Sequence, residues 1–182
     1  MAYTLSSLWR YPVKSMAGEQ IEAVEVTAAG LTGDRAYAVV DTANGKVGSA
    51  KNVRRFGELL MCQAWFVTPP DAGGRVPAVR ITMPDGTVVQ SDRPDAAAHL
   101  AVAFGPQISL VSTAPGGLML EFAAGTLGGK HAEPTEIPVA GAAPPGTLFD
   151  YASIHIVTTS TRRHEPVRVV DLGRTPGFPP GA

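Results

Sequence analysis

The stretch LWRYPVKSM (residues 8–16) joins an apolar run to a proline, a cation and a hydroxyl. Residues 8–11 are apolar or aromatic except for one arginine, a composition typical of a β-strand. Pro12 has no backbone N–H to donate to a sheet, so the strand is expected to end there. The sequence therefore predicts that Lys14 and Ser15 stand side by side just past the end of a strand.

Short β-branched runs recur along the first two thirds of the chain, separated by Gly, Pro, Asn and Asp. They predict strands at about residues 4–10, 21–27, 34–41, 47–51, 62–68, 79–83, 87–90 and 108–113. Asn-Gly at 44–45 and Asp-Gly at 85–86 each lie between two such runs and predict tight hairpin turns. Strands this short and closely spaced indicate a barrel or a sandwich.

Two helices are expected to interrupt the strands. Residues 52–60 offer Asn52 as an N-cap, and residues 91–105 offer an acidic start, Pro94 in the first turn and Gly105 past the end. We expect each helix to cover an opening or an edge of the sheet. The predicted fold class is thus mainly β, a β-barrel with two short helices and α+β overall.

The charge balance narrows the class of partner. With 182 residues, the chain holds 15 Lys and Arg against 16 Asp and Glu, for a net charge of -1, and no block of like charges. Nucleic acids and anionic membranes require a concentrated basic face, so we expect neither as a partner, and expect a small molecule instead. No apolar run is long enough to span a bilayer, and the N-terminus lacks a secretory signal, which favours a cytoplasmic location.

The composition changes after residue 113. Residues 114–148 are rich in Gly, Pro and Ala, which deny any long regular element and favour a connection between domains. Residues 149–161 contain another β-branched run, and the prolines of 162–182 predict an unfolded tail. The predicted organisation is a first domain at 1–113, the connection, a strand of a second domain at 149–161, and the tail.

Several chemical motifs are missing. The chain has no G-x-G-x-x-G after a strand and no P-loop, so no nucleotide site is indicated. His99, His131, His155 and His164 are not at ligand spacing with one another or with Cys62, so an all-protein zinc site is not expected. We expect a hydrogen-bonded core role for His155 and a buried inert thiol at Cys62.

A candidate anion site remains. In GLTGDRAYAVVD (residues 30–41), Arg35 falls on a predicted strand and can point its guanidinium into a groove. If Lys14, Ser15 and Arg35 converge, they combine a point charge, a hydroxyl donor and a fork that binds phosphate or carboxylate bidentately. The same residues also fit a solvated edge lysine, a turn serine and a surface ion pair of Arg35 with Asp34 or Asp41.

Four blocks in this order carry a family resemblance: LWRYPVKSMAGE, GLTGDRAYAVVD, GKVGSAK and PPGTLFDYASIHIVTTST. They resemble the N-terminal β-barrel of MOSC-domain proteins and the first strand of the MOSC domain that follows it. This family includes the C-terminal domains of molybdenum cofactor sulfurases and the mitochondrial amidoxime-reducing component. The resemblance covers about residues 3–161, and it implies a full-length protein that binds molybdenum cofactor (molybdopterin) for oxidoreduction or sulfur transfer.

The resemblance also implies roles for single residues. It places Lys14, Ser15 and Arg35 against the phosphate and pterin end of the molybdenum cofactor, where they position the cofactor and do not react. The hydroxyls of TTST are weaker candidates facing the same ligand: Thr158, Thr159, Ser160 and Thr161. Family members are also associated with pyridoxal phosphate, with which Lys14 could form a Schiff base, and the full-length family implies a redox partner protein.

The chain departs from the family at its C-terminal end. In the family the molybdenum-ligating thiolate comes from a cysteine deep in the MOSC domain, and Cys62 matches no family ligand. The residues after 161 lack the expected amphipathic helix and Arg-Pro-Asn segment. We therefore expect a truncated or frame-shifted chain with an incomplete second β domain, and catalysis by this chain alone stays open. A non-catalytic module that binds an anion or a partner protein, and an inactive remnant, are the alternatives.

Overall fold

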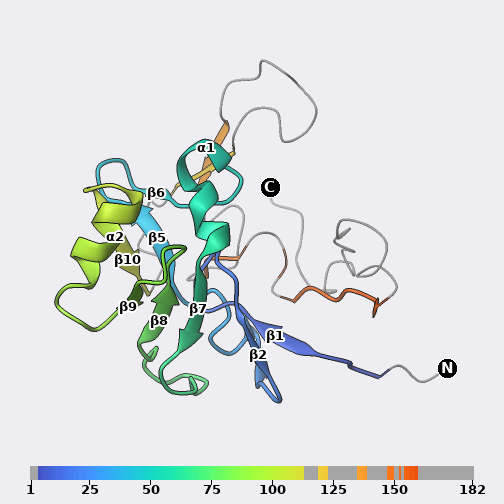
Figure 1. Cartoon of the computed structure of the whole chain (residues 1–182). Helices are drawn as coiled ribbons and strands as arrows, with labels where there is room; N and C mark the ends of the chain where they lie inside the picture. The colour runs from blue at the N-terminus through green and yellow to red at the C-terminus, as the bar shows by residue number, and fades with distance from the viewer. Residues whose placement is uncertain are drawn as a thin grey trace.

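A computed structural model of the chain describes residues 4–112, 119–122, 135–138, 147–149, 152 and 154–159. The described part consists of short strands in four small sheets, with two short α-helices and one 3-10 helix (Figure 1). The predicted β-rich α+β fold class is thereby confirmed. No helix in these ranges is long and apolar enough to cross a membrane.

The strands come in the following order. They are β1 (Leu8–Arg10), β2 (Glu19–Ile21), β3 (Val26–Thr27), β4 (Gly30–Leu31), β5 (Ala38–Asp41), β6 (Lys46–Val47), β7 (Gln63–Phe66), β8 (Val79–Thr82), β9 (Val88–Gln90), β10 (Ile108–Val111), β11 (Met119–Phe122) and β12 (Thr135–Pro138). The helices are α1 (Val53–Phe56), the 3-10 helix η1 (Gly57–Met61) and α2 (Ala96–Phe104).

Five strands form the largest sheet, in the order β10-β5-β6-β11-β12, and β7, β8 and β9 form a second, antiparallel sheet. β1 pairs with β2, and β3 pairs with β4, as separate two-stranded ribbons. Both predicted hairpins are confirmed. Gly45, with φ 69°, turns the chain from β5 to β6, and Gly86, with φ 86°, turns it from β8 to β9, a backbone region that glycine enters without a Cβ clash.

Some predicted boundaries are wrong. The strand expected at 21–27 is the end of β2 and the separate β3, and β4 was not expected. The strand expected from residue 34 begins at Ala38, because Asp34 donates its N–H to the Leu31 carbonyl in a turn and Arg35 has φ 48°. α2 begins at Ala96, so Pro94 lies in the turn before the helix and not in its first turn.

The expected connection contains regular structure. β11 and β12 pair with each other in antiparallel register, and β11 pairs in parallel with β6. Residues 114–148 were expected to lack any long regular element, and the two strands described there are four residues each, which fit between the glycines and prolines. The domain boundaries stay predictions, and the predicted tail 162–182 lies outside the described residues.

The hydrophobic core lies between the sheets and the helices. α2 packs on β9 and β10 and contributes Leu100 and Phe104, while α1 and η1 contribute Phe56 and Leu59 (Figure 1). An isolated parallel bridge between Val13 and Tyr37 holds the segment after β1 in this core. This bridge brings residues 12–16 alongside the start of β5, which positions the candidate site.

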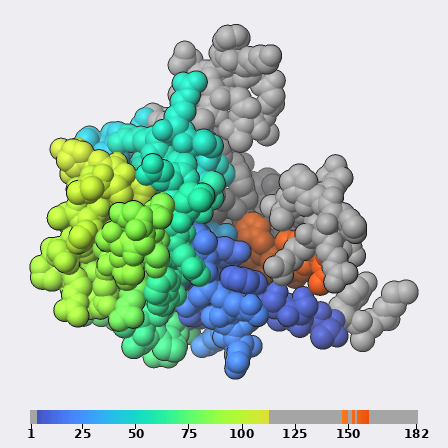
Figure 2. Space-filling model, in the orientation of Figure 1, coloured from blue at the N-terminus to red at the C-terminus, as the bar shows by residue number. Residues whose placement is uncertain are grey.

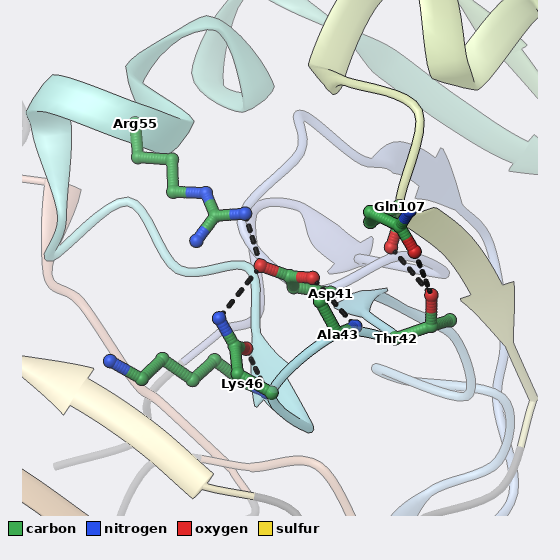
Figure 3. Close-up of polar contacts among 7 residues, drawn as sticks. Asp41, Thr42, Ala43, Lys46, Arg55 and Gln107 are labelled. Atoms are coloured by element: carbon green, nitrogen blue, oxygen red, sulfur yellow. Dashed lines mark hydrogen bonds and ion pairs between the residues drawn. The ribbon is translucent and has the colours of Figure 1, made fainter.

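Asp41 organises the turn between β5 and β6 (Figure 3). Its carboxylate accepts hydrogen bonds of 2.9 Å from the Ala43 N–H and from Asn44 Nδ2, and it forms an ion pair with Arg55 of α1. Burial alone would raise the pKa of Asp41, but the Ala43 hydrogen bond and the Arg55 contacts outweigh burial and lower the pKa. The carboxylate therefore stays ionised and ties α1 to the central sheet.

Candidate anion-binding site

Lys14 is buried, with 2% of its surface exposed. Its backbone N–H donates to the Tyr37 carbonyl at 2.8 Å, which continues the pairing of this segment with β5. Its Nζ donates a hydrogen bond of 2.9 Å to the carbonyl oxygen of Leu148. The alternative that Lys14 is a solvated edge lysine is therefore wrong.

Arg35 lies between two aromatic rings. Its guanidinium carbon is 5.5 Å from the ring centroid of Tyr11 and 5.7 Å from that of Phe149, both within the range of cation–π attraction. Nη1 pairs with the Asp34 carboxylate, and no other hydrogen bond from the guanidinium exists within the described residues. The side chain is 21% exposed, and Nε and Nη2 have no hydrogen-bond acceptor within the described residues.

Asp34 completes this arrangement. The side chain is 4% exposed, and Oδ1 accepts a hydrogen bond of 2.7 Å from the Tyr11 N–H while Oδ2 pairs with Arg35. Burial raises the pKa of Asp34, and the opposing effects of the Arg35 charge and the Tyr11 hydrogen bond do not cancel it. The predicted ion pair of Arg35 with an aspartate exists, but it is buried on the aspartate side and is not a plain surface pair.

Ser15 and Arg35 share an unusual backbone conformation. Ser15 has φ 65° and Arg35 has φ 48°, and they are the two non-glycine residues with positive φ in the described ranges. A side chain in this region costs of order 1 kcal/mol or more, and such strain clusters at functional sites. Ser15 Oγ accepts a hydrogen bond of 3.1 Å from the Ala50 N–H, so the hydroxyl braces the loop after β6.

The structure brings Lys14 and Arg35 to one short segment. Lys14 bonds to Leu148, and Arg35 lies by the ring of Phe149, the next residue; both segment residues are buried. Figure 2 shows the orange residues of this part of the chain against the blue N-terminal segments. Two cations from separate β-segments therefore meet at residues 148–149.

The TTST hydroxyls are less well placed. Thr158 and Thr159 are exposed, and neither lines the cavity next to Arg35. Ser160 and Thr161 lie outside the described residues. His155 is exposed as well, so its expected core role is wrong.

A cavity of about 280 Å³ opens beside Arg35. Asp34 and Arg35 form part of its wall, and residues 147–149 and the loop 70–74 form other parts. Lys14 does not line the cavity, but Leu148, which accepts its hydrogen bond, does. This volume is at the lower limit of small-molecule pockets, which suits one end of a larger ligand.

Cys62 is unsuited to metal binding. The thiol is buried, its Sγ lies 3.5 Å from the Glu58 carbonyl oxygen, and burial with the charges of Glu58 and Asp85 raises its pKa to about 11. A buried thiol with this pKa stays protonated near neutral pH, and its burial leaves it little access to a metal ion. The expectation of a buried thiol is confirmed, and the part of the chain that the structure describes holds no group of three His, Cys, Asp or Glu placed for a metal ion.

Sequence reasoning missed two members of the site. Tyr11 and Phe149 stack on Arg35. Asp34, which pairs with Arg35, was one of the two aspartates expected as its partner. Phe149 carried no signal in the sequence, because it reaches Arg35 only through the fold.

The comparison with protein families gives one match. The profile described as the MOSC N-terminal beta barrel domain matches residues 2–110, well over half of the chain. No curated protein and no solved structure shows significant similarity to the chain. The matched range contains β1 to β9, α2 and all three residues of the predicted anion site.

Proposed function

Because the chain belongs to the MOSC N-terminal beta barrel domain family, we propose that it holds the anionic end of molybdenum cofactor in the cavity beside Arg35. The observation that carries this proposal is the meeting of Lys14 and Arg35 at residues 148–149. Two cations gathered from distant parts of a chain with a net charge of -1 favour an anionic ligand at that point.

The residues present fit a phosphate group. Arg35 borders the cavity, keeps Nε and Nη2 without a protein acceptor in the described residues, and is held by two aromatic rings. A guanidinium fixed in this way loses little entropy when it binds an oxyanion. Lys14 adds positive charge from behind Leu148, where burial weakens solvent screening.

These residues bind and orient, while the bound cofactor supplies a redox-active metal or a sulfur acceptor. Ser15 holds the loop at Ala50 and keeps Lys14 in place, so it acts on the ligand through its neighbour. Cys62 supplies no thiolate. For the full-length protein, we propose oxidoreduction or sulfur transfer as the activity. The same proposal includes a redox partner protein and a cytoplasmic location.

Pyridoxal phosphate is the less favoured cofactor. A Schiff base requires the neutral amine of Lys14 to reach an aldehyde. The Nζ instead lies buried against the Leu148 carbonyl and away from the cavity wall. Lys14 would have to leave this position before it could react.

A non-catalytic anion-binding module is the second candidate function. The chain has one cysteine, and that thiol is buried with a raised pKa. An oxyanion can still bind at Arg35 without any metal. In that case inorganic phosphate or a phosphorylated metabolite binds the purified chain, and molybdenum does not accompany it.

Cofactor retention tests the proposal. The chain is purified from cells that make molybdenum cofactor, and bound molybdenum and pterin are measured per mole of protein. We expect both in the wild type and a loss of at least about 100-fold in affinity in the Lys14→Ala/Arg35→Ala variant, because two charge-assisted contacts disappear.

A matched control tests whether the loss of cofactor depends on these two positions or only on the number of positive charges removed. The Arg54→Ala/Arg93→Ala variant removes the same number of positive charges from exposed residues that do not line the cavity beside Arg35, and should retain the cofactor. Equal retention by the wild type and the Lys14/Arg35 variant would refute the site. Absence of pterin from wild-type protein, together with binding of inorganic phosphate, would favour the second candidate.

A further inference from the structure

We propose that Asp34 determines the anion preference of the cavity beside Arg35, so that the wild-type cavity holds oxyanions weakly near neutral pH and more tightly in acid. This inference rests on the proposed function, since it concerns the same cavity. It assigns a role in specificity to Asp34, whose carboxylate weakens the binding of oxyanions in this cavity.

The geometry places a negative charge next to the anion position. Asp34 and Arg35 both line the cavity, and the Asp34 carboxylate takes the Nη1 donor of Arg35. An incoming oxyanion therefore finds a guanidinium that is already partly neutralised. It also meets the repulsion of a carboxylate that is shielded from solvent, with only 4% of its side chain exposed.

Asp34 is held so that it cannot turn away. Its Oδ1 accepts the Tyr11 N–H at 2.7 Å, and Tyr11 in turn stacks on Arg35 and takes the Arg35 N–H on its carbonyl at 2.7 Å. Gly33, directly before Asp34, has φ 82°, and a Cβ there would meet Pro70 at 2.6 Å and Phe66 at 2.8 Å. The turn that carries Asp34 is thus fixed by close packing on both sides.

Protonation of Asp34 should release Arg35. Burial raises the pKa of this carboxyl, which brings its titration closer to neutral pH. When Asp34 becomes neutral, the cavity gains one unit of positive charge and Nη1 is freed from its ionic partner. Among the described residues, the charged groups that act on Asp34 are Arg35 in the same turn and His155 in the segment 154–159, and Asp71 also lines the cavity.

Sulfate is the probe for the test, because its charge does not change between about pH 4.5 and pH 7.5, so a change of affinity over this range comes from groups of the protein. Binding of sulfate is measured by calorimetry on the full chain. For the wild type we expect affinity to increase on the order of tenfold from neutral pH to the acid end. For Asp34→Asn we expect the tighter affinity already at neutral pH and little further change in acid.

Three variants make the result specific. Asp71→Asn removes the same charge from an exposed position on the same cavity and should tighten binding far less than Asp34→Asn. His155→Gln removes the histidine contribution and should leave most of the acid increase. Arg35→Ala should abolish sulfate binding in both the wild-type and the Asp34→Asn backgrounds.

Other results would overturn the inference. The first is an Asp34→Asn variant that binds sulfate no more tightly than the wild type or Asp71→Asn. The second is an increase of sulfate affinity in acid that persists in Asp34→Asn. The third is a wild type that binds no sulfate at any pH. The wild-type pH profile decides the question by itself if Asp34→Asn does not fold. A failure of cofactor retention with these sulfate results intact would refute the molybdenum cofactor and leave the role of Asp34 standing.

Discussion

The Nζ of Lys14 donates a hydrogen bond of 2.9 Å to the carbonyl oxygen of Leu148, which lies 134 positions further along the chain. The ammonium is almost fully buried, and the same segment places Phe149 beside Arg35. The contact therefore joins the start of the matched domain to a segment outside it. Stability and ligand binding should both depend on it.

Lys14→Ala should lower the free energy of unfolding by about 2–4 kcal/mol, because it removes a fully buried long side chain and leaves the Leu148 carbonyl without this donor. Lys14→Met should cost less, since the methionine chain refills most of the volume. Urea unfolding measures both. A smaller loss for the alanine variant than for the methionine variant would contradict this reading of the packing.

Ser15 offers a test of backbone strain. With φ 65°, a glycine at this position relieves strain that an alanine keeps, while both variants lose the hydrogen bond from Ala50. Ser15→Gly should therefore be more stable than Ser15→Ala by about 1 kcal/mol. Thermal or urea unfolding of the two variants gives the difference, and equal stabilities would show that the site is unstrained.

Asp41→Asn should lower the free energy of unfolding by about 2 kcal/mol at neutral pH, because an ionised carboxylate holds Ala43, Asn44 and Arg55 together. The folded-state pKa of Asp41 lies below its ordinary value of 3.8, so its stabilisation is complete above that pH. The stabilisation is lost as the pH falls through the lower folded-state pKa.

Unfolding measured from neutral pH to below pH 3.8 should show the gap between wild type and Asp41→Asn closing only at the acid end. Asp71→Asn is the control, since Asp71 is exposed and its replacement should change stability by less than about 0.5 kcal/mol. A gap that closes already near pH 6 would mean that another group is responsible.

Gly18 lies against the backbone of β1. A Cβ at this position would overlap the carbonyl oxygen of Arg10, which is backbone and cannot rotate away. Gly18→Ala should therefore cost about 2 kcal/mol or more. Gly57→Ala is the matched control, because Gly57 has helical φ and ψ and its nearest neighbour is a flexible valine side chain, so its stability should stay equal or rise. Equal effects of the two substitutions would contradict the close approach.

Local signals account for the parts of the fold that were predicted. The hairpins at Gly45 and Gly86 follow from dipeptides that need positive φ, and α2 follows from an apolar face closed by Gly105. The pairs β3 with β4 and β11 with β12 were missed, since strands of two to four residues in glycine-rich surroundings leave no periodic pattern. β11 also pairs with β6, which is distant in sequence.

The residues of the candidate site likewise fall into those that the sequence could indicate and those that only the fold brings together. Spacing singled out Lys14, Ser15 and Arg35 as residues able to form an anion site, and their fixed positions depend on pairing with β5. The direction of the Ser15 hydroxyl toward Ala50 and the stacking of Phe149 on Arg35 are long-range contacts. No pattern in residues 8–41 contains them, and only the folded chain reveals them.

The bond between Lys14 and Leu148 also constrains the order of events during synthesis. Apart from the parallel pairing of β6 with β11, the strands from β1 to β10 pair with one another, so they can assemble while the ribosome is still translating. Leu148 emerges much later, and closing so long a loop is slow compared with local pairing. The nascent domain therefore passes through a stage in which its core is formed while the cavity beside Arg35 still lacks the wall made by residues 147–149.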